Sequence, residues 1–139
     1  MGNNKNVSKK EYEMLASFRY ALRQFLHFSE QAAIAAGITP QQHQALLAIK
    51  GYPGRDSILV RELAERLQIR HHSAVELIDR LVRHQFVIRE HTGSDHRQVH
   101  VRLARRGEMV LAKLSEVHHE QLKRIGSELS PLLKRLGER

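Results

Sequence analysis

The stretch Ser57–Arg106, SILVRELAERLQIRHHSAVELIDRLVRHQFVIREHTGSDHRQVHVRLARR, decides the fold of this chain. It starts with a short extended segment, which is followed by two helices joined by a tight connection at 68–70. Two strands come next, 86–88 and 99–103, and the turn-rich run 92–96 separates them as the tip of a hairpin. A helix, a turn, a second helix and an antiparallel hairpin in this order predict a winged helix-turn-helix.

The second helix of this stretch is expected to run from about His71 to His84 and to present one end to another molecule. Its apolar residues recur at the three-and-four spacing of a helix with one buried face. They are Ala74, Leu77, Ile78, Leu81 and Val82. Polar side chains gather on the other faces at the N-terminal end of the helix. This concentration predicts a contact surface there.

Two further helices are predicted before the winged unit. Ser8, with Glu11 three residues later, has the pattern of a capping box and predicts the start of a long helix that stops by Gly37. Thr39 and Pro40 predict the N-cap and first residue of the next helix, because proline lacks only an N–H that is unpaired at that position. The apolar stripe of the first helix consists of Leu15, Phe18, Leu22, Phe25 and Leu26.

Helical sequence also follows the hairpin. A long helix is expected to begin at about Arg105 and to end near Gly126. Ser130 and Pro131 then predict the start of a last helix, with Leu132, Leu133 and Leu136 on one face. The whole pattern predicts a single domain, 1–139, that is mainly α with a small β-wing.

The composition agrees with one globular domain. A chain of 139 residues can bury one core, and 41% hydrophobic with 27% charged residues is close to the globular average. Apolar runs are far shorter than the roughly 20 residues that span a bilayer, and no secretory pattern opens the chain. A cytoplasmic protein without a membrane partner is therefore expected. The absence of cysteine excludes disulfides, thiolate metal ligands and cysteine redox switches.

The charge balance suits a polyanionic partner. The net charge is +8 and the pI is near 10.3, and Lys or Arg side chains that neutralise phosphates release condensed counterions. The stretch Ser57–Arg106 holds 10 Lys and Arg against 6 Asp and Glu, which is only a modest excess of positive charge. The direction of the charges must therefore matter more than their number. Six histidines lie in this stretch, namely His71, His72, His84, His91, His96 and His100.

Four short runs in this order resemble the MarR family of bacterial transcription regulators. They are Leu63-Ala64-Glu65-Arg66-Leu67, Ile78-Asp79-Arg80-Leu81, Asp95-His96-Arg97 and Leu103-Ala104-Arg105-Arg106-Gly107. Each run alone is a poor marker, but four at these separations make a fairly specific signal. The similarity extends over essentially the whole chain, including the helices before and after the winged unit.

The resemblance implies a homodimer that binds double-stranded DNA at a pseudo-palindromic operator and represses transcription. The helices at 8–36 and 107–139 of both subunits would form the dimer interface around the DNA-binding unit 57–106. The helix from His71 would enter the major groove, and Arg97 on the wing would reach the flanking minor groove. The family also implies release by a small-molecule effector, and no cofactor is expected.

The candidate DNA contacts lie on the front of the second helix and on the wing. A helix N-terminus brings unpaired N–H groups toward phosphates, and an Arg on a narrow hairpin tip suits the negative potential of a narrow minor groove. A solvated hairpin tip is the alternative for Arg97. The full set of candidates is Arg70, His71, His72, Ser73, Val75, Glu76, Arg80, Arg89, Asp95, His96 and Arg97.

Three residues of this set are candidates for reading bases. Ser73, Val75 and Glu76 lie near the front of the helix, where a Val can contact a thymine methyl group and a Glu can accept from cytosine N4. The alternative is that this face is an ordinary solvated face of an amphipathic helix.

The arginines and Asp95 leave alternatives open. Arg80 either binds phosphate or pairs with Asp79 or Glu76, and Arg89 either binds phosphate or pairs with Asp95. Asp95 is expected to shape the wing tip or orient an arginine, because a carboxylate is repelled by phosphates.

The chain departs from the family pattern at several helix ends. Relatives often have Ser or Thr before the two helices of the helix-turn-helix, where this chain has Leu59 or Val60 and Arg70. Gln85 stands where the family usually has a glycine, a position that often needs a left-handed backbone. Ala104 replaces a common threonine before the last long helix. These departures leave the fold intact but shift or weaken the caps.

Ten histidines raise the question of a metal site. His118 falls on an apolar stripe and is expected to be a core or interface histidine, while the adjacent His119 points roughly 100° away. His27 and His43 would approach one another if the first two helices cross. Without cysteines or a close set of carboxylates, no metal site is expected.

An effector pocket and an ordinary core are both compatible with the residues near His43. The family places a pocket between the dimer helices and the winged unit, and its candidate lining is Phe25, Phe28, His43 and Leu46. The same residues would also make a normal hydrophobic core.

The sequence does not predict an enzyme. It contains no nucleophile with a positioned base, no Gly-rich phosphate loop and no metal-ligand motif. The alternatives to an operator-binding regulator are a winged-helix module that binds protein and a basic RNA-binding domain without operator specificity.

Overall fold

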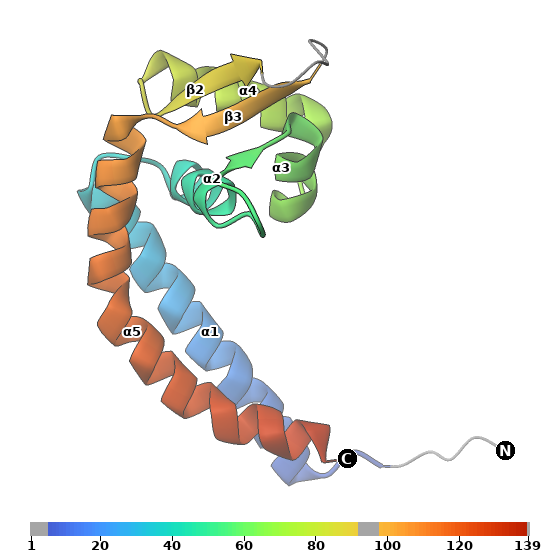
Figure 1. Ribbon diagram of the computed structural model, residues 1–139. Coiled ribbons are helices and arrows are strands. Elements are labelled where there is room, and N and C mark those ends of the chain that lie inside the picture. The colour runs from blue at the N-terminus through green and yellow to red at the C-terminus, as the bar shows by residue number, and fades with distance from the viewer. Residues whose placement is uncertain (1–5, 92–97, 139) are drawn as a thin grey trace, which may run out of the picture.

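The computed structural model describes residues 6–91 and 98–138. Figure 1 shows a winged unit at one end of two long helices, which confirms the predicted mainly α fold with a small β-wing. The elements are α1 (Lys9–Ala35), α2 (Pro40–Lys50), β1 (Ser57–Ile58), α3 (Val60–Leu67), α4 (His71–Arg83), β2 (Val87–His91), β3 (Val99–Leu103) and α5 (Arg105–Gly137).

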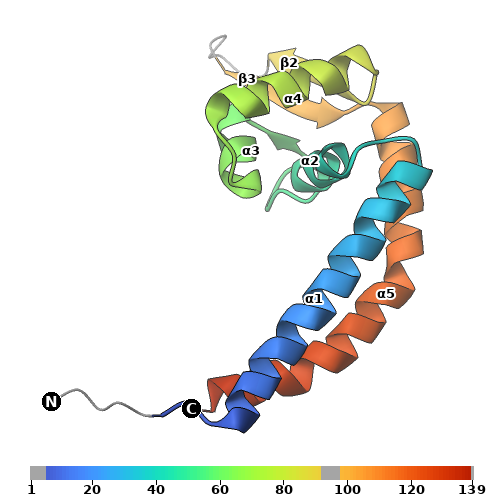
Figure 2. The ribbon, with the colours of Figure 1, turned by 180° about the vertical axis from the view of Figure 1, so that it is seen from behind.

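The helices α1 and α5 pack side by side and antiparallel, and we call this pair the stalk (Figures 1 and 2). The predicted apolar stripe of α1 divides into two parts. Phe18, Leu22 and Phe25 are half-buried, whereas Leu15 and Leu26 are 43% and 53% exposed. One chain therefore covers only part of the apolar surface of α1.

The three strands form one antiparallel sheet in the order β1-β3-β2. Ile58 pairs with Val101, and Val87 pairs with Leu103, so the short strand docks beside the hairpin as predicted. Ile58, Val87 and Val101 are at most 1% exposed and belong to the core that α2, α3 and α4 cover. The sheet thus fixes the hairpin to the back of the helix-turn-helix.

The predicted starts of α1 and α2 are confirmed. The Ser8 hydroxyl accepts from the Glu11 N–H at 3.2 Å, and α1 ends before Gly37, whose φ of +86° favours a residue without a side chain. Thr39 and Gln42 form a reciprocal capping box, with both hydrogen bonds at 3.0 Å. These caps fix the direction in which α2 leaves the stalk.

The predicted break near Gly126 is wrong. A single helix, α5, continues through Gly126 and Pro131 to Gly137. Proline removes one helical hydrogen bond, but Ile125, Leu129, Leu132 and Leu136 remain half-buried on one side of the helix across this region. Packing of that face outweighs the local signals that usually end a helix. Leu133, predicted to share a face with Leu132 and Leu136, is instead 52% exposed.

Gly107 lets the start of α5 approach the end of the helix-turn-helix very closely. A Cβ atom at this position would lie 2.1 Å from the Phe86 carbonyl oxygen. The same oxygen accepts a hydrogen bond from the Ala104 N–H at 2.9 Å. Arg106 adds to this contact, since it donates to the His84 carbonyl at 2.8 Å and stacks over Phe86. The base of the stalk is therefore fastened to the winged unit through its backbone.

Candidate nucleic-acid interface

The helix α4 lies across the end of the molecule that is farthest from the described chain ends (Figure 2). Its apolar stripe faces inward as predicted, with Ala74, Leu77, Ile78 and Leu81 all buried. The opposite face is free to contact a partner. α4 is thus held rigidly by the core while its polar side is presented to solvent.

Most candidates on α4 are exposed. Arg70, His71, His72, Glu76 and Arg80 are all exposed, so they are accessible to a ligand as large as a DNA duplex. Ser73 and Val75 are half-buried. The geometry therefore brings the predicted helix residues onto one accessible surface.

The start of α4 has open N–H groups. Arg70 occupies the N-cap position, as predicted, and a guanidinium group has only donors, so it cannot accept from the first turn. The N-terminus of α4 therefore combines unpaired backbone donors with the cationic side chain of Arg70. This combination is chemically suited to a phosphate group.

One carboxylate on this surface has a partner within the helix. The Glu76 carboxylate lies 3.1 Å from His72 Nε2, one helical turn away, and both side chains are largely exposed. Such a pair is weak in water, so it can be exchanged for other contacts at little cost.

Arg89 has a partner that the sequence did not indicate. Its guanidinium pairs with the Asp79 carboxylate, which ties β2 to α4. In the sequence, Asp79 was a candidate partner for Arg80, and Asp95 was a candidate partner for Arg89.

The wing strands are also joined by an ion pair between Arg102 on β3 and Glu90 on β2. These pairs brace the base of the hairpin against α4.

The wing tip is outside the described residues. Asp95, His96 and Arg97 all fall in the segment 92–97, so their expected roles stay predictions. The strands on both sides are described, and His91 pairs with Val99 at the last rung before the tip.

The unusual helix ends behave as the sequence predicted, with one addition. Leu59 is the N-cap of α3 and has no polar side chain, but the Glu62 carboxylate accepts from its N–H at 2.8 Å. Gln85 has a φ of +64°, which confirms the left-handed position after α4. Gln68 also adopts a left-handed conformation, with a φ of +54°, at the turn between α3 and α4. Nothing in the sequence predicts this conformation at Gln68, because such positions usually carry glycine or asparagine.

The candidate effector residues separate into two groups. Phe25, Phe28 and His43 surround His118, with their ring centroids 6.0, 5.4 and 5.1 Å from the His118 ring. Leu46 is fully buried in the core. His118 itself is 5% exposed, which confirms the prediction of a buried histidine. His43 thus lies against His118, whereas His27, which would approach His43 if the first two helices crossed, is exposed.

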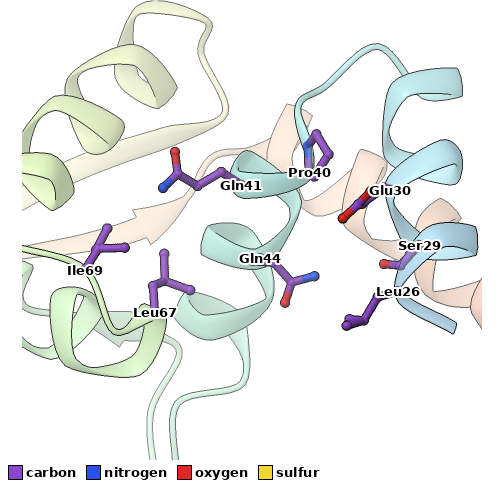
Figure 3. Close-up of a pocket in the computed structure, with 8 residues that line it drawn as sticks. All are labelled: Leu26, Ser29, Glu30, Pro40, Gln41, Gln44, Leu67 and Ile69. Atoms are coloured by element: carbon purple, nitrogen blue, oxygen red, sulfur yellow. The ribbon is translucent and has the colours of Figure 1, made fainter. Parts of the chain in front are cut away.

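A hollow of about 220 Å³ lies near these residues, between α1, α2 and the connection from α3 to α4 (Figure 3). A different set of residues lines it, which the sequence did not single out. They are Leu26, Ser29, Glu30, Pro40, Gln41, Gln44, Leu67 and Ile69. These residues come from three separate segments, so only the fold brings them together.

No metal centre is apparent in the part of the chain that the structure describes, since no three His, Asp or Glu side chains gather there at ligand distance. Within the same residues, no helix is long and apolar enough to cross a membrane.

Comparison with known proteins points to a family. The family model described as MarR family matches residues 36–98, which run from the end of the stalk through the helix-turn-helix into the wing. This part of the chain, just under half of its length, is similar to the MarR family. This match supports the resemblance to MarR family transcriptional regulators that the four short sequence runs carry. Regulators of this family are generally DNA-binding proteins without enzymatic activity.

Solved MarR structures share the fold of the whole chain. AbsC, a MarR family transcriptional regulator from Streptomyces coelicolor, has a TM-score of 0.67 at 19% identity over 98% of this chain and 100% of its own. A MarR mutant from E. coli complexed with operator DNA has a TM-score of 0.68 at 19% identity, over 86% of this chain and 88% of its own. A MepR mutant from S. aureus bound to an oligodeoxyribonucleotide has a TM-score of 0.66 at 18% identity, over 90% of this chain and 97% of its own. A search of curated protein sequences found no match.

Proposed function

We propose that two copies of this protein bind a pseudo-palindromic DNA operator and repress transcription. The observation that carries the proposal is the exposed N-terminal half of α4, held between a rigid core and a braced hairpin. Two relatives of the same fold have been solved with DNA, and this supports duplex DNA as the partner.

In this proposal the front of α4 enters the major groove. Arg70 and the open N–H groups of the first turn would contact phosphates, together with His71 and His72 when these rings are protonated. Ser73, Val75 and Glu76 would face base edges. Arg80, further along the helix, would contact the sugar-phosphate backbone.

The wing would contact the flanking minor groove. We assign Arg97 to the groove, with Asp95 and His96 shaping the tip around it. Arg89 would remain paired with Asp79 and act by holding the hairpin at a fixed angle to α4.

A homodimer is supported by the surface of the stalk. Large exposed apolar side chains on a monomer mark an interaction surface when they form a continuous patch. Among the described residues, both stalk helices carry them, namely Tyr12, Leu15, Tyr20, Leu26, Ile34, Met109, Val117, Leu122 and Leu133. A groove of about 640 Å³ between the end of α1 and the start of α5 continues this surface. A second copy of the stalk would cover it.

A small-molecule effector would bind where the stalk meets the winged unit. The hollow in Figure 3 has mainly apolar walls with a few polar groups, such as Ser29, Glu30 and Gln44, which is typical of a small-ligand site. A ligand there would touch α1 on one side and the connection before α4 on the other. It could therefore change the distance between the two recognition helices of a dimer.

The experiment that tests the proposal is a titration of labelled duplex at several salt concentrations. We expect the affinity to fall steeply with salt, because each neutralised phosphate releases counterions. Arg70→Ala should weaken binding and reduce the slope of log affinity against log salt by about 1. Lys123→Ala, which removes the same charge from the exposed side of the stalk, is the matched control and should change neither value.

Selection of bound genomic fragments would then give the operator. We expect two half-sites separated by a whole number of helical turns, because a two-fold dimer places its recognition helices on one face of the duplex. Binding that does not depend on salt, or a preference for single-stranded RNA or for a protein, would contradict the proposal.

A further inference from the structure

Two buried histidines join the winged unit to the stalk. His43 on α2 is 4% exposed, His118 on α5 is 5% exposed, and their ring centroids lie 5.1 Å apart with the planes tilted by 47°. Phe25 and Phe28 of α1 contact the His118 ring edge to face. Three helices thus meet at this pair, and one of them, α2, packs against α3 and the sheet of the winged unit.

The hydrogen bonds of His118 fix its neutral form. Its Nδ1 lies 2.6 Å from the Leu114 carbonyl oxygen, which can only accept, so Nδ1 carries the hydrogen. In the neutral ring Nε2 is then the acceptor, and it receives a hydrogen bond from the Ser29 hydroxyl at 2.9 Å. His118 is therefore fully satisfied as a neutral ring.

His43 is placed differently. Its Nδ1 is buried and has no hydrogen-bond partner among the described residues. A proton on this nitrogen would be a donor without an acceptor, next to a second imidazole. Burial lowers the pKa of His43, and the neighbouring His118 lowers it further.

No carboxylate balances a charge at this place in the described part of the chain. The charged and titratable residues nearest in sequence on the three helices are all exposed, and His118 is the only such group that shifts the pKa of His43. These residues are His27 and Glu30 on α1, Lys50 on α2, and Glu116, His119 and Glu120 on α5.

We propose that the His43–His118 pair is a pH-sensitive joint between the winged unit and the stalk, closed when both rings are neutral and opened by protonation. A protonated His43 gains free energy by moving toward water, and this movement carries α2 away from α5. In a dimer the spacing of the two α4 helices depends on the angle between stalk and winged unit, so opening the joint lowers operator affinity. The effect on affinity rests on the proposed operator binding, whereas the joint itself does not.

Acidification acts in the opposite direction on the DNA-facing histidines. His71 and His72 are exposed at the front of α4, and their protonation would strengthen attraction to phosphates. A loss of affinity in acid therefore reports the buried pair and not the surface.

The test compares duplex affinity at about pH 7.5 and about pH 5.5, on either side of the ordinary histidine pKa, at constant ionic strength. For the wild-type protein we expect at least about a threefold loss of affinity in acid. His43→Phe keeps a ring in place but cannot be protonated, so its ratio of affinities should be clearly smaller. His119→Gln removes an exposed histidine from the same helix as His118 and is the matched control, with the ratio of the wild type. Equal ratios in wild type and His43→Phe, or affinity that rises in acid in the wild type, would overturn the proposal.

Two measurements on the wild-type protein need no DNA. In an NMR titration the His43 ring should take up its proton at lower pH than the exposed histidines, and an ordinary titration would refute the joint. Amide hydrogen exchange in α2, corrected for its intrinsic pH dependence, should become faster in acid in the wild type but not in His43→Phe. If no duplex binds at any pH, the proposed function fails, and these two measurements still decide whether the joint exists.

Discussion

Replacing Gly107 by alanine tests how closely the stalk approaches the end of the helix-turn-helix. In most helix interiors this substitution stabilises, because alanine has a better helix propensity than glycine by roughly 1 kcal/mol. At position 107 the added Cβ would lie 2.1 Å from the Phe86 carbonyl oxygen, a distance that real Cβ contacts do not show. The contact is with backbone, so it cannot be relieved by turning a side chain.

The size of the effect follows from what must move. Separating α5 from residue 86 strains a packed region, which typically costs about 1–3 kcal/mol. It also weakens the hydrogen bond from the Ala104 N–H to the Phe86 carbonyl, which contributes about 1 kcal/mol. After the helix-propensity gain is subtracted, Gly107→Ala should lower the free energy of unfolding by about 2 kcal/mol.

The same helix offers a matched control. Gly126 lies on α5 and is exposed, and no described atom beyond its own helical turn lies within 4 Å of an added Cβ. Gly126→Ala should therefore raise the free energy of unfolding by about 0.5–1 kcal/mol. Both variants are compared by chemical denaturation at one protein concentration, because a dimer gains stability with concentration. If Gly107→Ala proved as stable as Gly126→Ala, the close approach of α5 to Phe86 would be refuted.

Three further changes have defined outcomes. Asp79→Asn breaks the exposed pair with Arg89 and should lower the free energy of unfolding by less than about 1 kcal/mol, and this difference should vanish in high salt. A large loss of stability in denaturation curves that does not depend on salt would contradict this prediction. Leu122→Asp combined with Leu133→Asp places charges on the exposed apolar side of α5. This double variant should be a folded monomer in sedimentation and should bind the operator much more weakly in a duplex titration. An intact dimer would argue against the stalk as the interface. Burial opposes ionisation of Glu62, but hydrogen bonds from Tyr52, the Leu59 N–H and Arg55 outweigh this effect and lower the pKa of Glu62. The stabilising contribution of Glu62 is therefore fully present at pH values above the ordinary glutamate pKa. It is lost as the pH falls through the lowered pKa of the folded protein. Glu62→Gln should flatten the acid limb of a plot of stability against pH, and an unchanged limb would refute the assignment.

The sequence predicted those parts of the fold that depend on local chemistry. The capping residues Ser8 and Thr39, the proline at 40 and the glycine at 37 set the ends of α1 and α2 through hydrogen bonds within a few residues. The left-handed position of Gln85 was also predictable, because its place in the family pattern is one that needs such a backbone.

The errors arose where distant contacts overrule local signals. Gly126 and Pro131 are common at helix ends, yet α5 continues because leucines on both sides of Pro131 pack on one face. The partner of Arg89 was missed for a similar reason. Asp79 is ten residues away in the sequence, and only the packing of β2 against α4 brings the two side chains together.

The candidate site was predictable only where its residues lie on a single helix. Residues on the exposed face of one helix, such as His71 and Glu76, follow from helical periodicity alone. The hollow in Figure 3 does not, because its walls come from α1, α2 and the connection after Leu67. A pocket built from three segments has no signature within any one of them.

The contacts between stalk and winged unit differ in how easily they can change. At the base of α5, Gly107 touches backbone and Lys50 of α2 holds Glu108 at 2.8 Å, a hydrogen bond that raises the pKa of Lys50. These contacts contain no histidine, which is the side chain whose charge ordinarily changes near neutral pH. The contact between His43 and His118, about three turns further along α5, is the one whose charge changes in that range. Opening it while the base stays fastened would make the winged unit rotate about the start of α5. Ser29 lines the hollow and also donates to His118, so a ligand that engages this hydroxyl would act on the same joint. Protonation and effector binding would then both change the position of the α4 helices through the contact between His43 and His118.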